Sequence, residues 1–380
     1  MVFKALKDIA HITMGQSPES ESYNDERVGI PFFQGNADFG EIYPNNRIWC
    51  SSPKKIAEPG DILISVRAPI GALNYAKERC CIGRGLAAIS IKDEAERNYV
   101  FHLLKAKNKE LNSKGTGSTF KAIGKNVLEE VLVPQISPKE QQKRMSIMDY
   151  LESIIRKRRE QLLFLDKLIK ARFVEMFGNP VANEKGWNVD LCKNLTTKIG
   201  SGATPKGGKE SYLTKGISLI RSLNVHNNQF VYDDLACISM EQAEKLNNVI
   251  IQQGDVLLNI TGASVARCCI VPNSVLPARV NQHVSIIRCN EKLLPVFVSC
   301  MFTDDNFQQF LLNVATGGGA TREAITKEEI EKFVLITPPI ERQKKFVDFV
   351  EQIDKSKVAV QKALDEAQLL FDSLMQEYFG

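Results

Sequence analysis

The sequence predicts an α+β protein with two tandem globular domains, each followed by a long helix, and with the two helices packed as an antiparallel coiled coil. Two observations lead to this prediction: an internal repeat that spans the chain, and two long segments in which apolar residues recur at heptad spacing. A length of 380 residues is enough for two or three domains with sizeable cores.

The internal repeat is visible as short matches that keep their order along the chain. A shift that grows from 187 to 202 residues indicates surface loops that changed length around a shared scaffold. The matches pair residues 15–18 with 202–205, 29–34 with 216–221, 59–64 with 253–258, 115–123 with 317–325, and 176–178 with 378–380.

Each repeat ends in a segment typical of a long helix. Ser137, Pro138 and Glu140 form a capping-box sequence with proline at the first helical position, and the second segment follows Pro338-Pro339. We expect helices of about 38 residues, or ~57 Å at ~1.5 Å per residue. The heptad-spaced apolar stripes are Met148, Leu151, Ile155, Leu162, Leu165, Ile169 and Met176, with Arg158 and Arg172 on the same stripe, and Phe346, Val350, Ile353, Val360, Leu364, Ala367, Phe371, Leu374 and Tyr378, with Lys357.

The segments before the helices predict irregular α+β domains. Short β-prone runs at 62–66, 256–260 and 284–287 alternate with loops rich in Asn and Gly, and residues 98–111 suggest a short helix. The expected boundaries are therefore 1–136 for the first domain, 137–178 for its helix, 179–338 for the second domain and 339–380 for its helix.

Composition sets broad limits on the class of protein. The net charge is +4, which neither supports nor excludes a nucleic-acid partner. The first residues lack the apolar core of a signal peptide, and no apolar run approaches the ~18 residues of a membrane span. The nine cysteines show no C-x-x-C spacing, so we expect reduced, mostly buried thiols in a cytoplasmic protein without a membrane partner.

Catalytic and metal-binding patterns are missing from the sequence. Residues 202–210 resemble a phosphate loop, but an additional glycine and Glu210 replace the Gly-Lys-Ser/Thr ending, so a turn is expected. Asn179-Pro180 lacks the aromatic residue of an adenine methyltransferase motif. The basic run 156–159 suggests a solvated or partner-contacting helix face, and the separated histidines His11, His102, His226 and His283 suggest no metal site. We therefore expect no catalytic residue, no metal and no cofactor on this chain.

After catalytic and metal-binding motifs, the remaining candidates for function are polar, glycine-rich loops that recur in both repeats. Arg, Asn, Gln and Lys side chains read base edges or hold phosphates, and glycine allows a backbone to approach a phosphate closely. The candidate DNA-binding residues are Gln16, Ser17, Gln34, Asn36, Arg67, Arg84, Lys114, Ser118, Thr119 and Lys121 in the first repeat, and Thr204, Lys206, Arg221, Asn224, Asn259, Thr261, Ser264, Arg267, Asn281, Gln282, Thr321 and Arg322 in the second.

These features resemble the specificity subunit of type I restriction-modification systems. The resemblance rests on the segment 59–71 (PGDILISVRAPIG), on 115–120 followed by 134–141, and on 337–343 (TPPIERQ), within the two-repeat plan of the whole chain. It implies that each globular domain reads one half of an asymmetric bipartite DNA target while the helices set the spacing between halves.

The resemblance also implies partners and cofactors. The expected partners are double-stranded DNA, two modification (methyltransferase) subunits and the restriction subunits, with S-adenosylmethionine, ATP and Mg on those subunits. Two alternatives remain open: a coiled-coil scaffold that binds proteins without DNA specificity, and a self-contained methyltransferase or nuclease, which the missing motifs disfavour.

Overall fold

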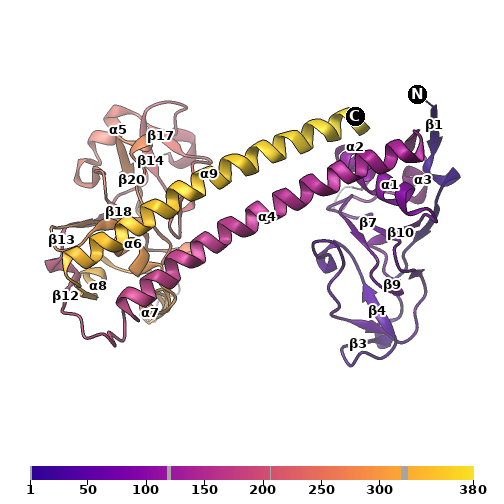
Figure 1. Ribbon diagram of the computed structural model, residues 1–380. Coiled ribbons are helices and arrows are strands. Elements are labelled where there is room, and N and C mark those ends of the chain that lie inside the picture. The colour runs from indigo at the N-terminus through magenta and orange to yellow at the C-terminus, as the bar shows by residue number, and fades with distance from the viewer. Residues whose placement is uncertain (1, 118–120, 206, 318–323) are drawn as a thin grey trace. The chain divides into compact units, whose positions relative to one another are not determined.

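A computed structural model describes residues 2–117, 121–205, 207–317 and 324–380 (Figure 1). The chain forms two compact units: unit 1 contains Met1–Arg159 and Gln361–Gly380, and unit 2 contains Glu160–Val360. The two long helices, α4 (Pro138–Phe177) and α9 (Ile340–Phe379), each have 40 residues and contribute one half to each unit. The domain ranges expected from the sequence assign each helix to its own repeat, whereas the compact units divide both helices.

Unit 1 is built on two sheets that share no strand. The first has the order β2–β10–β7–β8 with every pair antiparallel, and the second has the order β3–β5–β4–β9–β6 with β4 and β9 parallel. Side chains from both sheets, among them Phe33, Leu63 and Ile82, form a common buried cluster. The strands are β1 (Val2–Ala5), β2 (His11–Met14), β3 (Tyr23–Asn24), β4 (Ile30–Phe33), β5 (Trp49–Cys50), β6 (Ile56–Ala57), β7 (Ile62–Ser65), β8 (Leu73–Tyr75), β9 (Cys80–Ile82), β10 (Leu86–Ser90) and β11 (Leu132–Gln135), which pairs with β1; the helices besides α4 and α9 are α1 (Glu94–Ala106), α2 (Asn108–Ser113) and α3 (Lys125–Glu129).

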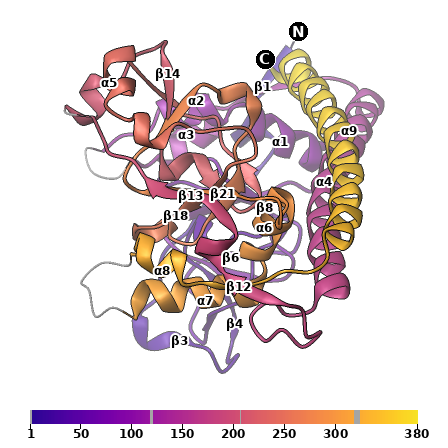
Figure 2. The same cartoon turned by 90° about the vertical axis from the view of Figure 1, so that its left-hand side faces the viewer.

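Unit 2 repeats this plan. Its four-stranded sheet has the order β13–β21–β18–β19, and its three-stranded sheet β17–β14–β20 again contains one parallel pair, β14 with β20. Helices α6 and α8 pack on the four-stranded sheet (Figure 2). The strands are β12 (Val189–Leu191), β13 (Thr196–Ser201), β14 (Ile217–Ile220), β15 (Val225–His226), β16 (Gln229–Phe230), β17 (Ala236–Ile238), β18 (Val256–Asn259), β19 (Cys268–Ile270), β20 (Ala278–Val280), β21 (Val284–Cys289) and β22 (Val334–Ile336); the helices are α5 (Met240–Glu244), α6 (Pro295–Phe302), α7 (Asp305–Thr316) and α8 (Lys327–Glu331).

The equivalent strands confirm that the repeat is structural. In unit 1 Ile62 of β7 pairs with Ile89 of β10, and in unit 2 Val256 of β18 pairs with Ile287 of β21. The β-prone runs predicted at 62–66, 256–260 and 284–287 are β7, β18 and β21. The helix predicted at 98–111 is instead two helices that meet at Lys107, and Asn112 of the second donates its side-chain amide to the carbonyl of Ile70 at 2.7 Å.

Within unit 2 the second half of α4 packs against the first half of α9. Phe346 of α9 has no exposed surface and contacts Phe173 and Phe177 of α4 with ring centroids 5.6 and 5.5 Å apart. The polar residue on the α9 stripe, Lys357, forms an ion pair with Asp166 of α4 at 2.6 Å. Burial alone would lower the pKa of Lys357, but its hydrogen bond and attraction to Asp166 hold that pKa above its ordinary value.

Within unit 1 the first half of α4 packs against the second half of α9. The guanidinium of Arg144 lies 4.6 Å from the centre of the Tyr378 ring, and Arg159 donates to Gln368 at 3.3 Å. Early residues of one helix therefore contact late residues of the other in both units, and the predicted antiparallel pairing is confirmed.

One of the two hydrogen bonds of the predicted capping box is present at the start of α4. Ser137 Oγ accepts from the Glu140 backbone at 3.2 Å, whereas the Glu140 carboxylate accepts from Arg144.

The nine cysteines are all free thiols, and seven of them are buried. Burial raises the pKa of the Cys192 and Cys269 thiols to about 12, so these thiols stay protonated near neutral pH. In the described part of the chain, no helix combines the length and the apolar character that a bilayer crossing requires.

We predict that Phe346→Ala lowers the free energy of unfolding of unit 2 by about 3–5 kcal/mol, because it leaves a cavity among buried aromatic rings. Val358→Ala, on the exposed side of the α9 half that belongs to unit 2, serves as the control and should change stability by less than ~0.5 kcal/mol. Urea denaturation followed by circular dichroism measures both. Equal effects of the two substitutions would contradict the aromatic packing described here.

Candidate nucleic-acid interface

In unit 1 the predicted loops converge at one end of the sheet β2–β10–β7–β8. Because neighbouring strands are antiparallel, the end of β2, the start of β10 and the end of β7 lie at the same end of the sheet. Backbone hydrogen bonds then join the loops to one another. Val66 N donates to Gly85 O at 2.9 Å, Ile123 N donates to Val66 O at 2.9 Å, and Gly83 N donates to Phe33 O at 2.8 Å.

Unit 2 joins its loops with corresponding bonds. Ile260 N donates to His283 O at 3.0 Å, Ile325 N donates to Ile260 O at 2.8 Å, and Asn281 N donates to Ile220 O at 3.1 Å. The backbone framework of the candidate interface is therefore the same in both units.

The side chains carried by this framework differ between the units. When the corresponding backbone hydrogen bonds of the two units are matched, Arg84 of unit 1 is equivalent to Gln282 of unit 2. Arg67 is equivalent in the same way to Thr261. The residue after Arg84 is Gly85, whereas the residue after Gln282 is His283. Each unit thus presents a distinct set of donors and acceptors on the same scaffold.

Glycine makes the close approach of these loops possible. A Cβ on Gly15 would lie 2.1 Å from the carbonyl oxygen of Gly83, and a Cβ on the equivalent Gly202 would lie 1.8 Å from that of Val280. No real Cβ tolerates such contacts with backbone atoms. This steric requirement explains why the short match at residues 15–18 and 202–205 begins with glycine in both repeats.

Most predicted residues of unit 1 lie on these loops with accessible side chains. Lys114 is also accessible, although it pairs with Glu110 at 2.6 Å. The backbone of Arg84 donates to the Ser17 hydroxyl at 3.4 Å, which brings two of the predicted residues together. The exposed predicted residues are Gln16, Gln34, Arg67, Arg84, Lys114 and Lys121, and the half-buried ones are Ser17 and Asn36.

In unit 2 three predicted residues are buried, and the prediction that their side chains contact DNA is corrected. Asn259 donates its amide to the carbonyls of Ser222 and Val225 at 2.9 and 3.3 Å. Asn224 donates to the carbonyl of Val231 at 3.0 Å, and the Asn281 carbonyl oxygen accepts from the His283 backbone at 3.0 Å. These asparagines have the polarity of base-reading residues, but the structure uses their hydrogen bonds to hold the loops.

Two arginines of unit 2 are held by contacts within the unit. Arg221 lies 5.2 Å from the centre of the Tyr212 ring and donates to the carbonyl of Asp234. Arg267 lies 3.5 Å from a ring nitrogen of His226. Both side chains remain partly exposed, as do those of Thr204, Thr261 and Ser264, and Gln282 is exposed. The predicted residues Ser118, Thr119, Lys206, Thr321 and Arg322 lie outside the described residues.

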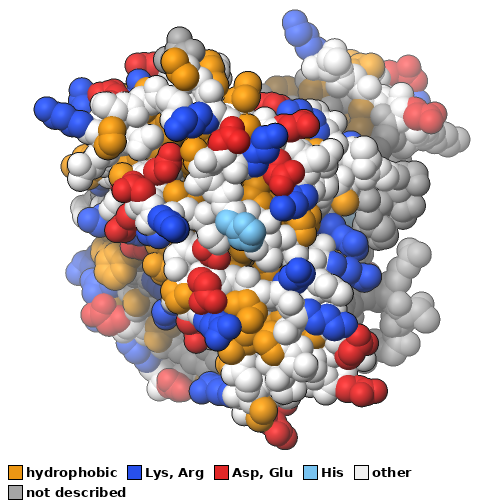
Figure 3. All heavy atoms as spheres, turned by 90° about the vertical axis from the view of Figure 1, so that its right-hand side faces the viewer, with side chains coloured by type: hydrophobic (Ala, Val, Ile, Leu, Met, Phe, Trp, Pro, Cys, Tyr) orange, Lys and Arg blue, Asp and Glu red, His pale blue; other side chains and the backbone are white. Residues whose placement is uncertain are grey.

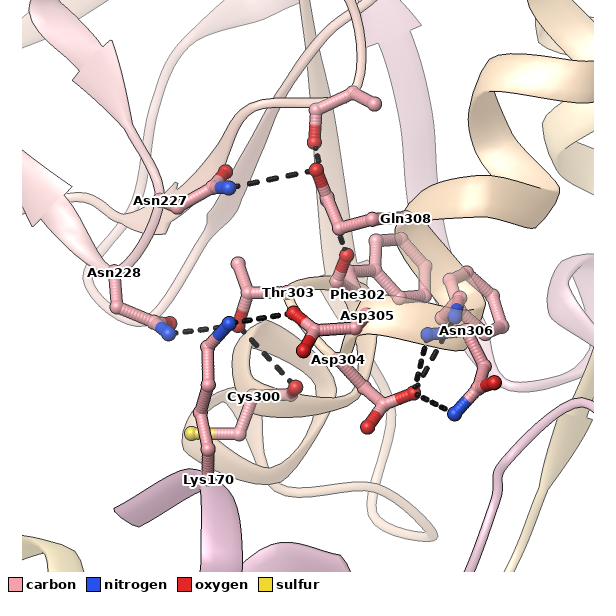
Figure 4. A network of polar contacts seen from close by, with 12 residues as sticks. Lys170, Asn227, Asn228, Cys300, Phe302, Thr303, Asp304, Asp305, Asn306 and Gln308 are labelled. Atoms are coloured by element: carbon pink, nitrogen blue, oxygen red, sulfur yellow. Dashed lines mark hydrogen bonds and ion pairs between the residues drawn. The ribbon is translucent and has the colours of Figure 1, made fainter. Parts of the chain in front are cut away.

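The loop at 261–267 is anchored by a polar network on helices α6 and α7 (Figure 4). Gln308 of α7 donates its amide to Ala266 O at 2.8 Å, and Asn227 lies within hydrogen-bond distance of Gln308. Asn228 donates to the Thr303 hydroxyl at 2.6 Å, which ties the β15–β16 turn to the end of α6. These hydrogen bonds hold the candidate loop at 261–267 and the β15–β16 turn against α6 and α7.

His283 lies among the candidate interface residues, although it is not one of the residues predicted from the sequence. Its ring lies between Thr261, at 2.5 Å from Nδ1, and Gln282, at 3.2 Å from Nε2. The available signal was its position directly after Asn281-Gln282 in a predicted recognition loop. Because His283 has no metal-ligand spacing, the sequence alone predicts a structural or surface histidine.

The motifs rejected from the sequence form ordinary local structures. Asn179 accepts from the backbones of Val181 and Ala182 at 2.9 and 3.1 Å, which makes a turn after α4. Gly208–Ser211 is a short 3-10 helix. In the basic run, Arg156 lies 3.6 Å from Glu41. Across the described ranges, no three His, Cys, Asp or Glu side chains are grouped as metal ligands.

Charge on the visible face of unit 1 is mixed. Figure 3 shows Lys and Arg side chains interspersed with Asp and Glu over this face, without a large patch of one sign. On this face, neither sign of charge dominates.

Comparison with known proteins agrees with this geometry. The family described as "Type I restriction modification DNA specificity domain" matches residues 1–163 and again residues 185–367. The type I restriction enzyme MjaIX specificity subunit of Methanocaldococcus jannaschii is 26% identical over 411 residues, covering 98% of this chain and 91% of that protein. A second protein of the same organism, provisionally assigned as the MjaX specificity subunit, is 46% identical over 156 residues, covering 40% of this chain and 36% of that protein.

A solved structure shows the same fold at low sequence identity. The S subunit of a type I restriction-modification system from M. genitalium superposes with a TM-score of 0.60 at 12% identity, covering 100% of this chain and 96% of that one. Because the family domain matches twice and covers most of the sequence, this chain belongs to the specificity subunits of type I restriction-modification systems. Such subunits recognise the DNA target and are non-catalytic, and the resemblance found in the sequence is confirmed.

We predict that Gly202→Ala displaces the loop at 202–205 and destabilises unit 2 by about 1–3 kcal/mol, because the new Cβ collides with backbone. Gly200→Ala is a matched control two residues away, where a Cβ would meet only the flexible end of Lys198 at 3.7 Å. Thermal melting of both variants measures the difference. If Gly202→Ala melts like Gly200→Ala, the close approach of the loops is not required.

Proposed function

We propose that this chain reads an asymmetric bipartite DNA sequence, with residues 1–136 acting as one target-recognition domain and residues 179–338 as the other. The observation that carries the proposal is the pair of loop sets held by corresponding backbone bonds but bearing different side chains. Two readers with the same scaffold and different donors and acceptors select different half-sites. Joining two weak readers in one chain also raises affinity through effective concentration.

The paired helices serve as the spacer between the two half-sites in this proposal. Each is 40 residues long, or ~60 Å at ~1.5 Å per residue, and neither contains an interior glycine or proline. A continuous helix pair resists bending, so it would fix the number of unread base pairs at ~3.4 Å per pair. A change of helix length would therefore change the spacer.

The chemistry of modification and cleavage belongs to other subunits in this proposal. Two modification subunits would bring S-adenosylmethionine, and restriction subunits would bring ATP and Mg, in the cytoplasm. The buried, protonated thiols described above suit a reducing compartment. The +4 net charge is sufficient if the modification subunits also contact the DNA backbone.

We predict that exchanging residues 1–136 for those of a relative changes one half of the target and leaves the other half and the spacer unchanged. Long-read methylation mapping of a host that carries the hybrid with its modification subunits measures the target. Changes in both halves would contradict modular reading. An unchanged target would favour a scaffold without DNA specificity.

We predict that Arg84→Ala weakens binding of the complex to its mapped target by roughly 5- to 100-fold, because an arginine–base contact contributes about 1–3 kcal/mol of discrimination. Arg79→Ala, at the opposite end of β9, removes the same charge from an exposed arginine outside the loops and should change affinity less than ~3-fold. Fluorescence anisotropy at two salt concentrations measures both. Equal losses for the two variants would mean that only net charge matters.

A further inference from the structure

Unit 2 contains a buried aspartate that is paired with an arginine. Asp255 directly precedes β18 and has no exposed surface. Its Oδ1 accepts from Arg288 Nε at 2.7 Å, and its Oδ2 accepts from Arg288 Nη2 at 2.8 Å. This is the two-point contact that a planar guanidinium makes with a carboxylate. The arginine compensates for the loss of water around a buried negative charge.

Unit 1 has the equivalent aspartate in the same backbone turn. Asp61 directly precedes β7 and is 8% exposed. Its Oδ2 accepts from the Glu58 backbone at 2.9 Å, as Oδ2 of Asp255 accepts from the Gln252 backbone at 2.7 Å. The backbone nitrogens of Asp61 and Asp255 donate back to the carbonyls of Glu58 and Gln252 at 3.0 and 3.1 Å. The two carboxylates are therefore presented in the same way.

The arginine, however, is replaced by a serine in unit 1. The matched registers of β7 with β10 and of β18 with β21 make Ser90, the last residue of β10, equivalent to Arg288. Among the described residues, no cation pairs with Asp61, and the hydrogen bond from Glu58 is the one that its side chain accepts. Unit 1 thus keeps a nearly buried carboxylate and lacks the side chain that neutralises it in unit 2.

Asp61 and Ser90 line a surface hollow of about 610 Å³. This volume lies within the range of small-ligand sites and is more than an arginine side chain needs. Four carboxylates and three Lys or Arg side chains line the hollow, so its charge does not exclude a cation.

Arg97 also lines this hollow, but it does not replace Arg288. Its guanidinium lies 3.6 Å from the Glu94 carboxylate. Its Nε is buried and has no hydrogen-bond partner among the described residues. Asp61 therefore retains an acceptor that no cation of unit 1 uses.

We propose that this hollow is a binding site for a guanidinium group, which Asp61 receives as Asp255 receives Arg288. A guanidinium fits better than an ammonium, because its planar fork donates to both carboxylate oxygens at once. The group belongs either to an arginine side chain of a partner protein or to a small guanidinium compound.

The site lies away from the recognition loops. Asp61 precedes β7 and Ser90 ends β10, whereas the loops follow β7 and precede β10. The hollow is therefore at the opposite end of the four-stranded sheet, where a bound group leaves the loops accessible. The inference goes beyond the proposed function and does not rest on it.

Binding of N-acetyl-arginine amide to the full chain tests the proposal, because this probe carries a guanidinium and no other charge. A titration followed by saturation-transfer NMR measures its Kd, which should be on the order of 1 mM for a single side chain. N-acetylcitrulline amide has nearly the same shape without the charge, and N-acetyllysine amide has the charge without the fork. Each should bind at least ~10-fold more weakly.

Two substitutions locate the binding, and a third is the control. Asp61→Asn keeps an oxygen for the Glu58 backbone but loses the charge, so it should weaken binding of the probe by ~10-fold or more. Ser90→Arg supplies from the chain the guanidinium that unit 2 already has, and it should block the probe to a similar extent. Asp8→Asn removes the same charge from an exposed carboxylate of the hollow and should change the Kd less than ~3-fold.

Undiminished binding in Asp61→Asn or in Ser90→Arg would overturn the inference, as would equal binding of the arginine and citrulline probes. Melting curves show whether each variant is folded. Should Asp61→Asn not fold, Ser90→Arg decides alone, because unit 2 contains an arginine at the equivalent position.

The complex with the modification subunits identifies the source of the group. If a partner's arginine fills the site, the assembled complex should not bind the probe, and Asp61→Asn should weaken assembly by ~10-fold or more. If the complex binds the probe as tightly as the isolated chain does, the natural ligand is a small guanidinium compound.

Discussion

The fold depends on the packing of the two long helices against each other within both compact units. In unit 2 the buried rings of Phe173, Phe177 and Phe346 join α4 to α9, and in unit 1 Phe379 near the end of α9 lies 5.2 Å from Tyr99. Each aromatic side chain removes a large apolar area from water. Neither unit is therefore complete without a helix half from the other repeat, and the helices are part of both cores.

A second constraint governs the recognition loops. Their backbones are fixed by hydrogen bonds between main-chain atoms and by the glycines Gly15 and Gly202, so the loop framework does not depend on most of the side chains it carries. The side chains can therefore vary while the framework persists. Two copies of one framework can therefore carry Arg84 in one unit and Gln282 with His283 in the other.

The candidate site was predictable from the sequence only in part. Loop composition correctly located Arg67, Arg84 and Gln282 on exposed or partly exposed loops, but it also selected Asn224, Asn259 and Asn281, which are buried. Asparagine serves equally well to read a base and to cap a loop, because both uses require the same amide. The partner of that amide depends on residues distant in the chain, such as Val231 for Asn224.

By itself, the sequence determined the repeat, the limits and heptad stripes of α4 and α9, the central strands β7, β18 and β21, and the family. These features are local or periodic, because capping residues, apolar spacing and β-prone runs act over a few neighbouring positions. The tertiary structure alone decided that each unit contains halves of both helices, that Asn259 supports a loop from inside, and that His283 meets Gln282 and Thr261. Such contacts join residues far apart in sequence, and no pattern along the chain predicts which loops meet at the end of a sheet.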